Sequence, residues 1–219
     1  MSTDGVVPAE SRLTRKGRAT RDRIVTTAAG LMFDHGVAGT SIEDVQAAAG
    51  VSSSQIYHYF RDKRALVRAV IICQTDAVLG AQQPLLDRLD SVEALRKWRD
   101  LLVGLQRERH YEGGCPIGSL AGELADTDPA ARVALAAGFS TWESAIRAGI
   151  QAMRDRGELP GEADPERLAR ALLAALQGGL LLTQVRRDTA GLEAGLDTVI
   201  DHIASLAATV SAGTSQHVG

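Results

Sequence analysis

The stretch that decides the fold is TSIEDVQAAAGVSSSQIYHYFRDK, residues 40–63. It holds two short segments, and in each one hydroxyl side chains precede residues whose apolar spacing is typical of a helix. Thr40 to Glu43 and Ser52 to Gln55 both match the capping box, in which two side chains reciprocally satisfy free backbone amides. Between them lies Gly50, which predicts a tight turn. We therefore predict two short helices joined at this glycine.

Two short helices joined in this way form the helix-turn-helix arrangement, whose second helix enters the major groove of DNA. If Ile56 and Phe60 point inward, the other side chains of the second helix face outward. Small hydroxyls let a helix approach the bases, a glutamine amide can pair with adenine, and tyrosine, histidine, threonine and lysine can bind phosphates. The predicted DNA-binding residues are Thr40, Ser52, Ser53, Ser54, Gln55, Tyr57, His58 and Lys63. Each could instead be a core or capping residue, but the whole set in this order favours DNA binding.

Charge is distributed unevenly along the chain. The net charge of -3 excludes a uniformly basic surface, yet residues 12–23 carry six basic side chains and one acidic one. We expect residues 1–17 to form a flexible basic arm that reaches DNA phosphates; a merely solvated tail is the alternative. The next domain, the helix-turn-helix domain, is expected at residues 18–64.

The remaining sequence also predicts helices, so the fold class is all-α. With 219 residues, of which 45% are hydrophobic and 23% charged, the chain can form a small and a larger folded part. Asp128-Pro129 and Asp164-Pro165 each place proline at the first position of a helix, where it is well tolerated. Besides the helix-turn-helix segments and a helix after Asp62, the expected helices are 20–35, 91–110, a short one near 117–125, 129–156, 165–187 and 191–210. Residues 65–219 are the expected larger domain.

The last two of these helices predict a homodimer. They carry leucine, isoleucine or valine around much of their circumference, and Gly178-Gly179 permits close helix packing. One protomer would not cover all of this apolar surface, whereas two pairs of helices form a four-helix bundle about a twofold axis. A twofold protein in turn predicts a palindromic DNA operator.

Residues 18–72 resemble the N-terminal domain of TetR/AcrR-type transcriptional regulators. The shared features are Thr20-Arg21, Gly36, Thr40-Ser41, AAGV at 48–51, YHYF at 57–60, Asp62-Lys63 and Leu66. The resemblance implies an all-helical homodimer, a small-molecule effector bound in the C-terminal domain, and repression as the usual mode of action. The sequence departs from the family at Ser53-Ser54-Gln55-Ile56, where a basic residue followed by Gly-Thr-Leu is common. This departure shifts base recognition towards hydroxyl and amide groups.

The segment GCPIGSLAGELAD, residues 114–126, resembles one that lies near the effector cavity in some of these regulators. Facing helices supply a mostly apolar lining with few polar groups, as a ligand pocket requires, although ordinary core packing would use the same residues. The predicted effector-binding residues are Trp98, Tyr111, Cys115, Phe139, Trp142 and Gln177. Cys115 could be a redox or thiol sensor, but a small buried apolar side chain is the favoured interpretation.

Other classes of function fit the sequence less well. We predict no enzyme, cofactor or metal site, because no P-loop, HExxH, G-x-S-x-G or dinucleotide fingerprint is present. The alternatives are a Cys-dependent enzyme, suggested by His110 near Cys115, and a helical adaptor or small-molecule-binding protein without DNA binding. Two cysteines, no signal-like N-terminus and an apolar stretch at 171–185 too short for a bilayer predict a cytoplasmic protein without membrane contact.

Overall fold

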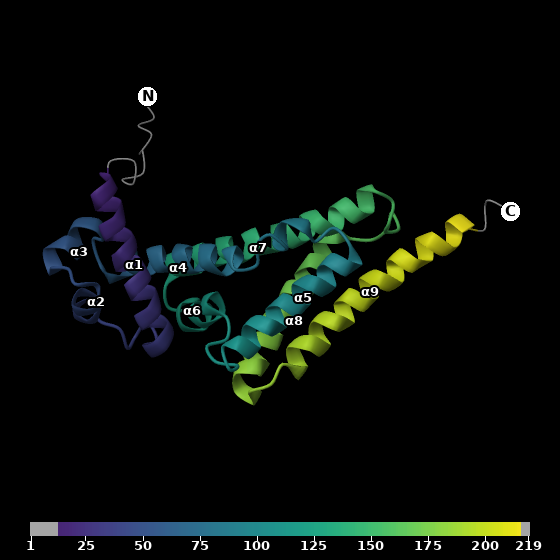
Figure 1. Cartoon of the computed structure of the whole chain (residues 1–219). Coiled ribbons are helices and arrows are strands. Elements are labelled where there is room, and N and C mark those ends of the chain that lie inside the picture. Colours follow the sequence, from purple (N-terminus) through teal and green to yellow (C-terminus); the bar gives the residue numbers. More distant parts are fainter. Residues whose placement is uncertain (1–12, 216–219) are drawn as a thin grey trace, which may run out of the picture. The chain divides into compact units, whose positions relative to one another are not determined.

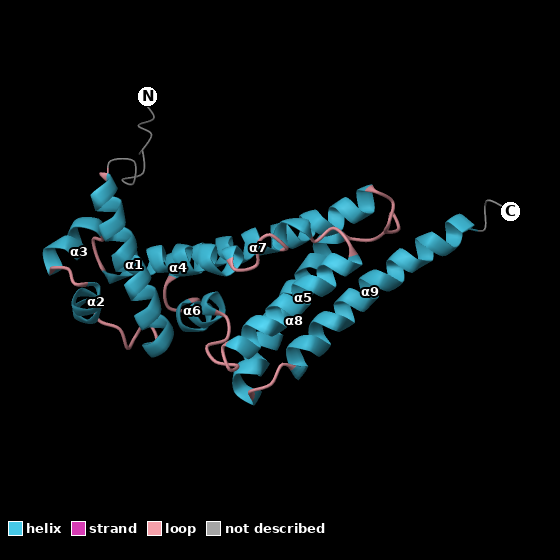
Figure 2. Ribbon diagram, viewed as in Figure 1, coloured by secondary structure: helices cyan, strands magenta, loops and turns pink. Residues whose placement is uncertain are grey.

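The computed structural model describes residues 13–215, with side chains described through residue 210, and all regular elements in this part of the chain are helical (Figure 2). The predicted all-α class is therefore confirmed. The chain divides into two compact units, residues 1–73 and 74–219, so the division lies beyond the predicted boundary at residue 64. Most of the predicted arm, residues 1–12, lies outside the described residues.

The first unit contains α1 (Arg15–His35), α2 (Ile42–Ala49), α3 (Ser53–Tyr59) and the beginning of α4 (Lys63–Gly80). Helix α1 packs against both α2 and α3. Its apolar face supplies Ile24, Val25 and Ala28 to a core that also takes Val45 from α2 and Ile56 from α3. Helices α2 and α3 are short, and they are held in place because α1 buries the inner face of each.

Helix α1 begins five residues before the predicted start at Thr20, and the last part of the expected arm is helical. The cause is Thr14, which caps the helix: its hydroxyl accepts the amide of Gly17 at 3.1 Å. Arg15 and Lys16 are therefore fixed on the first turn of a helix.

The second unit contains the end of α4, the 3-10 helix η2 (Leu86–Arg88) and five further helices. These are α5 (Val92–Glu108), α6 (Pro116–Leu124), α7 (Pro129–Asp155), α8 (Pro165–Arg186) and α9 (Ala190–Ser215). Asp128 and Asp164 cap α7 and α8 by accepting backbone amides, and a proline follows each, as predicted. Their starts agree with the sequence because a cap is decided by residues within one turn.

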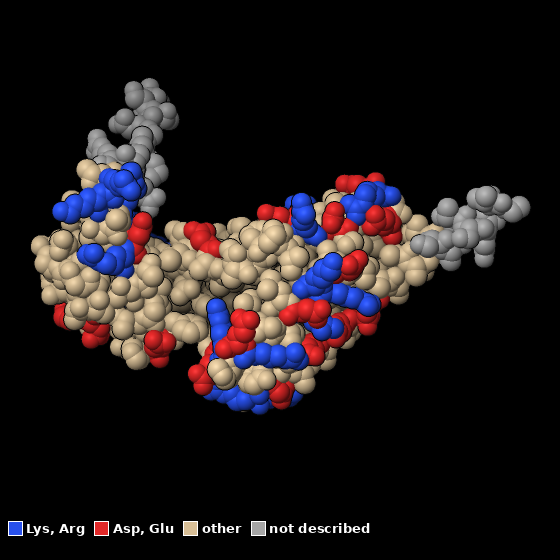
Figure 3. All heavy atoms as spheres, in the orientation of Figure 1, with Lys and Arg blue, Asp and Glu red and all other residues tan. Residues whose placement is uncertain are grey.

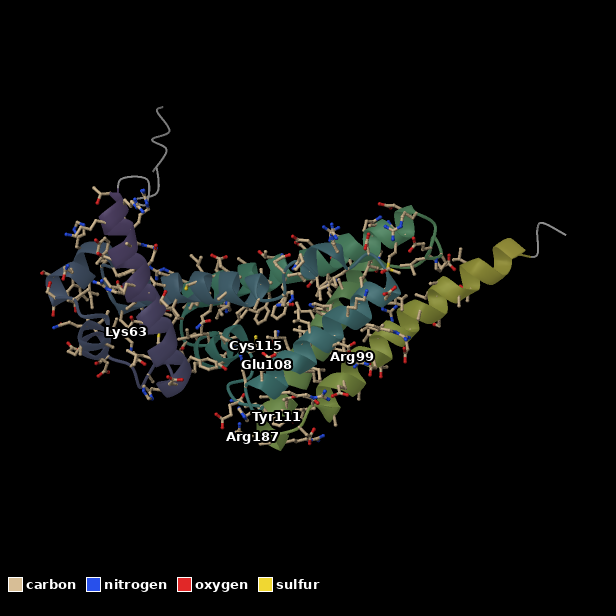
Figure 4. The ribbon with its side chains drawn as sticks, viewed as in Figure 1. Lys63, Arg99, Glu108, Tyr111, Cys115 and Arg187 are labelled. Carbon is tan, nitrogen blue, oxygen red and sulfur yellow. The ribbon has the colours of Figure 1, made fainter. Side chains whose placement is uncertain are left out.

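Helix α8 is central in the second unit, since it packs against α7 on one side and α9 on another, and α5 lies beside α9 (Figure 1). A Cβ atom on Gly179 would lie 2.6 Å from the Cα atom of Leu192, so this glycine permits the close approach of α8 and α9. Ion pairs join α5 to α9 at three levels: Arg96–Asp201 at 3.1 Å, Arg99–Asp197 at 2.8 Å and Arg107–Glu193 at 2.9 Å. Figure 3 shows both signs of charge interspersed over these helices, and Figure 4 labels Arg99.

The predicted apolar stretch at 171–185 lies within the longer helix α8. By length and composition alone, this 22-residue helix is long and apolar enough to span a bilayer. Nine residues of α8 are nonetheless buried inside the unit. These residues pack in the core of the second unit.

Candidate DNA-binding surface and effector cavity

The α2–α3 pair has the geometry of a helix-turn-helix. Helix α2 ends at Gly50, whose φ of 61° lies in the left-handed region, where glycine is favoured over other residues. The amide of Gly50 donates to the carbonyl of Ala47, and Val51 is buried beneath the turn. Helix α3 then starts at Ser53, as the sequence predicted.

The capping box of α2 differs from the prediction by one residue. Its N-cap is Ser41, whose hydroxyl accepts the amide of Asp44, while the Asp44 carboxylate accepts the amide of Ser41 at 2.8 Å. The Ser41 hydroxyl also donates to this carboxylate, at 2.6 Å. The hydrogen bonds from the Ser41 hydroxyl and from the Ser41 amide lower the pKa of Asp44 below its ordinary value. The box therefore consists of Ser41 and Asp44 instead of Thr40 and Glu43.

Thr40, unlike the predicted contact residues on α3, is buried and has a structural partner. Thr40 is only 1% exposed, and its hydroxyl donates to the carbonyl of Gly36 at 2.9 Å. The side chain closes the α1–α2 loop, where Gly36 has a positive φ of 74°. Thr40 thus stabilises the loop that positions α2.

Helix α3 presents a polar outer face. Ile56 and Phe60 are buried, as predicted, and the predicted contact residues Ser52, Ser53, Ser54, Gln55, Tyr57 and His58 are all exposed. The exposed fraction of Tyr57 is 54%, high for a large aromatic side chain. An exposed helix face of hydroxyls, an amide, a phenol and an imidazole can bind both base edges and phosphates.

The polar groups at the start of α3 already hydrogen-bond to one another. The predicted box is present: Ser52 accepts the amide of Gln55 at 3.2 Å, and the Gln55 side-chain oxygen accepts the amide of Ser52 at 2.9 Å. The hydroxyls of Ser52 and Ser54 lie 2.9 Å apart. Ser53 donates to the side-chain oxygen of Gln46 on α2. The Gln55 side-chain oxygen is therefore engaged in capping α3. If Gln55 paired with adenine, a bond from the base would replace the bond from the Ser52 amide.

Lys63 begins α4, where the sequence placed it, but its side chain has a structural partner. The ammonium group donates to the carbonyl of Val37 at 2.6 Å, from a half-buried position (Figure 4). An ammonium has three donors, so phosphate binding and this bond are compatible. Asp62 accepts the amide of Ala65 at 2.7 Å, and this bond lowers the pKa of the Asp62 carboxyl.

The structure also shows exposed basic residues that the predicted set of DNA-binding residues did not name one by one. Arg15, Lys16, Arg18 and Arg23 are exposed on α1, and Lys and Arg side chains gather over the N-terminal half of this helix (Figure 3). The side chain of Arg61, directly after α3, is 88% exposed. The sequence could have placed the basic residues of α1 on a helix, because Thr14 is a good N-cap directly before them.

The second unit contains a cavity of about 100 Å³ among α4, α5, α7 and α8. Its wall is mostly apolar, and two of the predicted effector residues, Cys115 and Trp142, belong to it. An adjoining groove of about 370 Å³ contains Cys115 again, together with the predicted residues Phe139 and Gln177. Four of the six predicted residues thus line two neighbouring hollows that share Cys115.

The other two predicted effector residues lie elsewhere. Trp98 is fully buried and lines neither hollow, and its indole nitrogen donates to the side-chain oxygen of Gln82 at 2.8 Å. Tyr111 belongs to the turn after α5, with a φ of 63°, and its carbonyl accepts the Arg187 guanidinium at 3.2 Å (Figure 4). Trp98 therefore has a core role, and Tyr111 has a role in the turn.

Cys115 is the N-cap of α6 and is buried, with its sulfur accepting the amide of Gly118 at 3.4 Å. Burial raises the pKa of the Cys115 thiol above its ordinary value, and the hydrogen bond from the Gly118 amide only partly opposes this effect. A neutral, buried thiol fits the favoured interpretation of Cys115 as a small apolar side chain.

The predicted dimer surface is smaller than the sequence suggested. Most apolar residues of α8 and α9, including Leu172, Leu176 and Leu196, are buried within the unit itself. The argument that one protomer leaves them uncovered is therefore wrong for these positions. The large apolar side chains of α8 that remain exposed are Leu181, Leu182 and Val185.

Both units match known protein families. Residues 24–70 match the family described as bacterial regulatory proteins, tetR family, and residues 91–199 match the tetracyclin repressor-like C-terminal domain. An HTH-type transcriptional regulator in the lacX 3' region of Lactococcus lactis is 31% identical over 82% of this chain and 91% of its own length. The HTH-type transcriptional repressor DhaR of Mycobacterium sp. strain GP1 is 24% identical over 83% of this chain and 90% of its own length.

Solved structures agree with these matches. A TetR transcriptional regulator from Chloroflexus aurantiacus has a TM-score of 0.75 and 31% identity, covering 87% of this chain and 97% of that protein. The regulatory protein TetR from Rhodobacter sphaeroides shares the fold, with a TM-score of 0.71 and 21% identity over 84% of this chain and 98% of that one. With the helix-turn-helix in the first unit and the matched helical domain in the second, this chain belongs to the TetR/AcrR family of transcriptional regulators.

Proposed function

We propose that this regulator is a repressor that binds a palindromic DNA operator as a homodimer and is released by a small-molecule effector. The observation that carries the proposal is the polar, exposed outer face of α3, a helix held by α1 and joined to α2 by the Gly50 turn. The similar protein DhaR is named as a repressor, which supports repression as the mode of regulation. Such a protein acts on DNA, so we infer a cytoplasmic location.

In the proposed complex, α3 lies in the major groove. The exposed Ser53, Ser54 and Gln55 lie at its N-terminal end, which in helix-turn-helix proteins contacts base edges. Tyr57, His58 and Lys63 bind phosphates, with Ser52 holding the cap. Residues 1–17 add an electrostatic contribution, and the helical part of this segment contributes Arg15 and Lys16.

Helix α4 supplies the physical basis for ligand control. Its first turn belongs to the DNA-binding unit, and its later residues Gln74, Ala77 and Val78 line the cavity of the second unit. An effector in the cavity contacts α4 and favours a dimer in which the two α3 helices no longer fit successive half-sites. Because both half-sites must be occupied together, losing this match lowers the overall affinity for the operator.

The dimer forms through α8 and α9 of two protomers. Leu181, Leu182 and Val185 form an exposed apolar patch on α8 that association would remove from water. Two copies of α8 and α9 then make a four-helix bundle, with the same patch used on both protomers.

Selection of binding sites from random duplex DNA, with the full-length protein, tests this proposal. The expected result is an enriched inverted repeat bound by two protomers, with much weaker binding by the double variant Tyr57→Ala/His58→Ala. Arg147→Ala, an exposed basic position on α7, is the matched control and should retain binding. Failure to enrich any sequence, or selection of a single half-site by a monomer, would refute the proposal.

A further inference from the structure

The cavity of the second unit has a distinct chemical character. Its apolar wall includes Leu102, Leu105 and Leu180, and no aspartate or glutamate is among its lining residues. The only basic side chain there, that of Arg109, belongs to an exposed residue. A cationic ligand would find no opposite charge, and an anionic ligand would lose its hydration for a single solvated guanidinium.

Two polar groups in this wall have no hydrogen-bond partner among the described residues. They are the side-chain oxygen of Gln106 on α5 and the indole nitrogen of Trp142 on α7. Both residues are more than nine-tenths buried, with exposed fractions of 5% and 1%. Buried polar groups without a partner are rare because each one has given up its hydrogen bond to water. One of these groups is an acceptor and the other a donor.

A second tryptophan and a second glutamine in this part of the unit do have hydrogen-bond partners. The indole of Trp98, which lies outside the cavity lining, donates to Gln82, and the amide of Gln82 donates to the carbonyl of Val78 at 2.8 Å. The other two unpaired buried groups in the described part of the chain belong to Gln177, which lines the adjoining groove, and Thr183. The cavity lining thus includes one satisfied glutamine, Gln82, beside the unsatisfied atoms of Gln106 and Trp142.

The volume limits the size of a ligand. An apolar cavity of about 150 Å³ binds benzene, so a cavity of about 100 Å³ suits a single small ring, part of which can extend into the adjoining groove that shares Cys115. Such a molecule buries its apolar body against the leucines and must still satisfy one acceptor and one donor.

We propose that the effector is a small, neutral organic molecule with an apolar body and a hydroxyl-type group that both donates and accepts hydrogen bonds. The group donates to the side-chain oxygen of Gln106 and accepts from the indole of Trp142. This inference rests on the proposed function only in that the bound ligand acts as an effector. Binding of the ligand to the cavity can be measured without DNA.

A matched series of probes tests the chemistry on the full-length protein by titration calorimetry in the absence of DNA. Phenol carries a donor and an acceptor, anisole only an acceptor, and benzene neither, while benzoate and benzylammonium add a negative or positive charge. Phenol should bind about tenfold or more tightly than benzene, with anisole between them and both ions weaker than phenol. Equal binding of phenol and benzene, or tighter binding of benzoate, would overturn the proposal.

Substitutions then assign the two contacts. Trp142→Phe removes the donor, and Gln106→Leu removes the acceptor, so each should reduce the preference for phenol over benzene severalfold. Thr183→Val is the control: it removes an unpaired buried hydroxyl that lines neither hollow, and it should leave this preference unchanged. If a variant proves unstable to heating, the probe series on the unmodified protein still decides the proposal.

The outcome separates this inference from the proposed function. If the protein selects a palindrome but binds none of the five probes, the ligand class is wrong and the DNA-binding role stands. If phenol binds with the expected preference but the operator complex is unaffected, the cavity chemistry stands and the effector-release mechanism fails.

Discussion

Ser53 on α3 donates its hydroxyl proton to the side-chain oxygen of Gln46 on α2, so the two helices of the motif are joined by side chains at the surface predicted to meet DNA. A serine hydroxyl has one proton and two lone pairs. With its proton directed to Gln46, Ser53 presents an acceptor to the groove. Adenine and cytosine offer amino donors there, so the base facing Ser53 should be one of these two.

We predict that Gln46→Ala lowers operator affinity about fivefold and relaxes the preference at one base position in each half-site. The loss corresponds to one ordinary hydrogen bond, and the relaxed preference arises because the Ser53 hydroxyl becomes free to rotate and donate. Site selection with both proteins measures the change. Gln46→Glu retains the acceptor and should keep the base preference; if it relaxes as much as Gln46→Ala, the pair does not orient Ser53.

The lowered pKa of Asp44 predicts that the stability of the fold depends on pH. Hydrogen bonds from Ser41 lower the pKa of the Asp44 carboxyl in the folded protein. A lowered pKa means that the ionised carboxylate stabilises the fold above the unfolded value of about 4, and that this contribution is lost as the pH falls through the folded value. The unfolding temperature of Asp44→Asn should therefore be below that of the unmodified protein at neutral pH, and the two should converge below pH 4.

Thermal denaturation between pH 7 and pH 3 measures this difference. Ser41→Ala removes the hydroxyl, the larger of the two groups that lower the pKa of Asp44, and keeps the backbone amide. The change from Ser41→Ala to the double variant Ser41→Ala/Asp44→Asn should therefore show a weaker pH dependence than the change from the unmodified protein to Asp44→Asn. A difference between Asp44→Asn and the unmodified protein that stays constant across this range would contradict the assignment.

Much of the fold could be predicted because the decisive interactions are local. The Ser52–Gln55 box and the Asp128 and Asp164 caps each join residues within three positions, so the sequence contains both partners side by side. The box of α2 was placed one residue too early because Thr40/Glu43 and Ser41/Asp44 fit the same pattern. The choice depends on the Thr40 hydroxyl, which bonds to Gly36 in the preceding loop.

The site was less predictable because its partners are distant in sequence or equivalent in pattern. Lys63 reaches the carbonyl of Val37, and no local rule anticipates that contact. Helical spacing placed Trp98 and Trp142 on inner faces alike, but it could not say which indole finds an acceptor. Exposed Leu181 and Val185 were likewise indistinguishable from the buried leucines of α8, because each helix is apolar around most of its surface.

The basic first turns of α1 should contribute to DNA affinity in a salt-dependent manner. Replacing Arg15, Lys16 and Arg18 together by alanine leaves the Thr14 cap in place, whereas deletion of residues 1–17 would remove it. The slope of log affinity against log salt should fall by about 0.9 for each phosphate contact that is lost. Electrophoretic mobility shifts at several salt concentrations measure the slope, and Arg132→Ala on α7 is the control. An unchanged slope would exclude a role for this segment.

Cys115 should react slowly with alkylating reagents at neutral pH. Burial keeps the thiol protonated and raises its pKa, and only the thiolate attacks iodoacetamide. Labelling of the Cys115 peptide, followed by mass spectrometry, should be at least tenfold slower in the folded protein than in urea, and should accelerate as the pH rises. Labelling at the unfolded rate at pH 7 would instead favour the thiol-sensor alternative.

The exposed patch on α8 leads to a prediction about assembly. Leu181 and Val185 are 62% and 72% exposed and lie one helical turn apart, so both face the same side of α8. Burial of such side chains contributes about 1.5–3 kcal/mol each, and an aspartate in their place would be buried without a partner. The double variant Leu181→Asp/Val185→Asp should therefore weaken the dimer at least about 100-fold, as measured by sedimentation equilibrium. Val133 on α7 is 67% exposed, and Val133→Asp places a carboxylate on another helix and should not have this effect. A dimer that dissociates on Val133→Asp and survives the α8 changes would place the interface elsewhere.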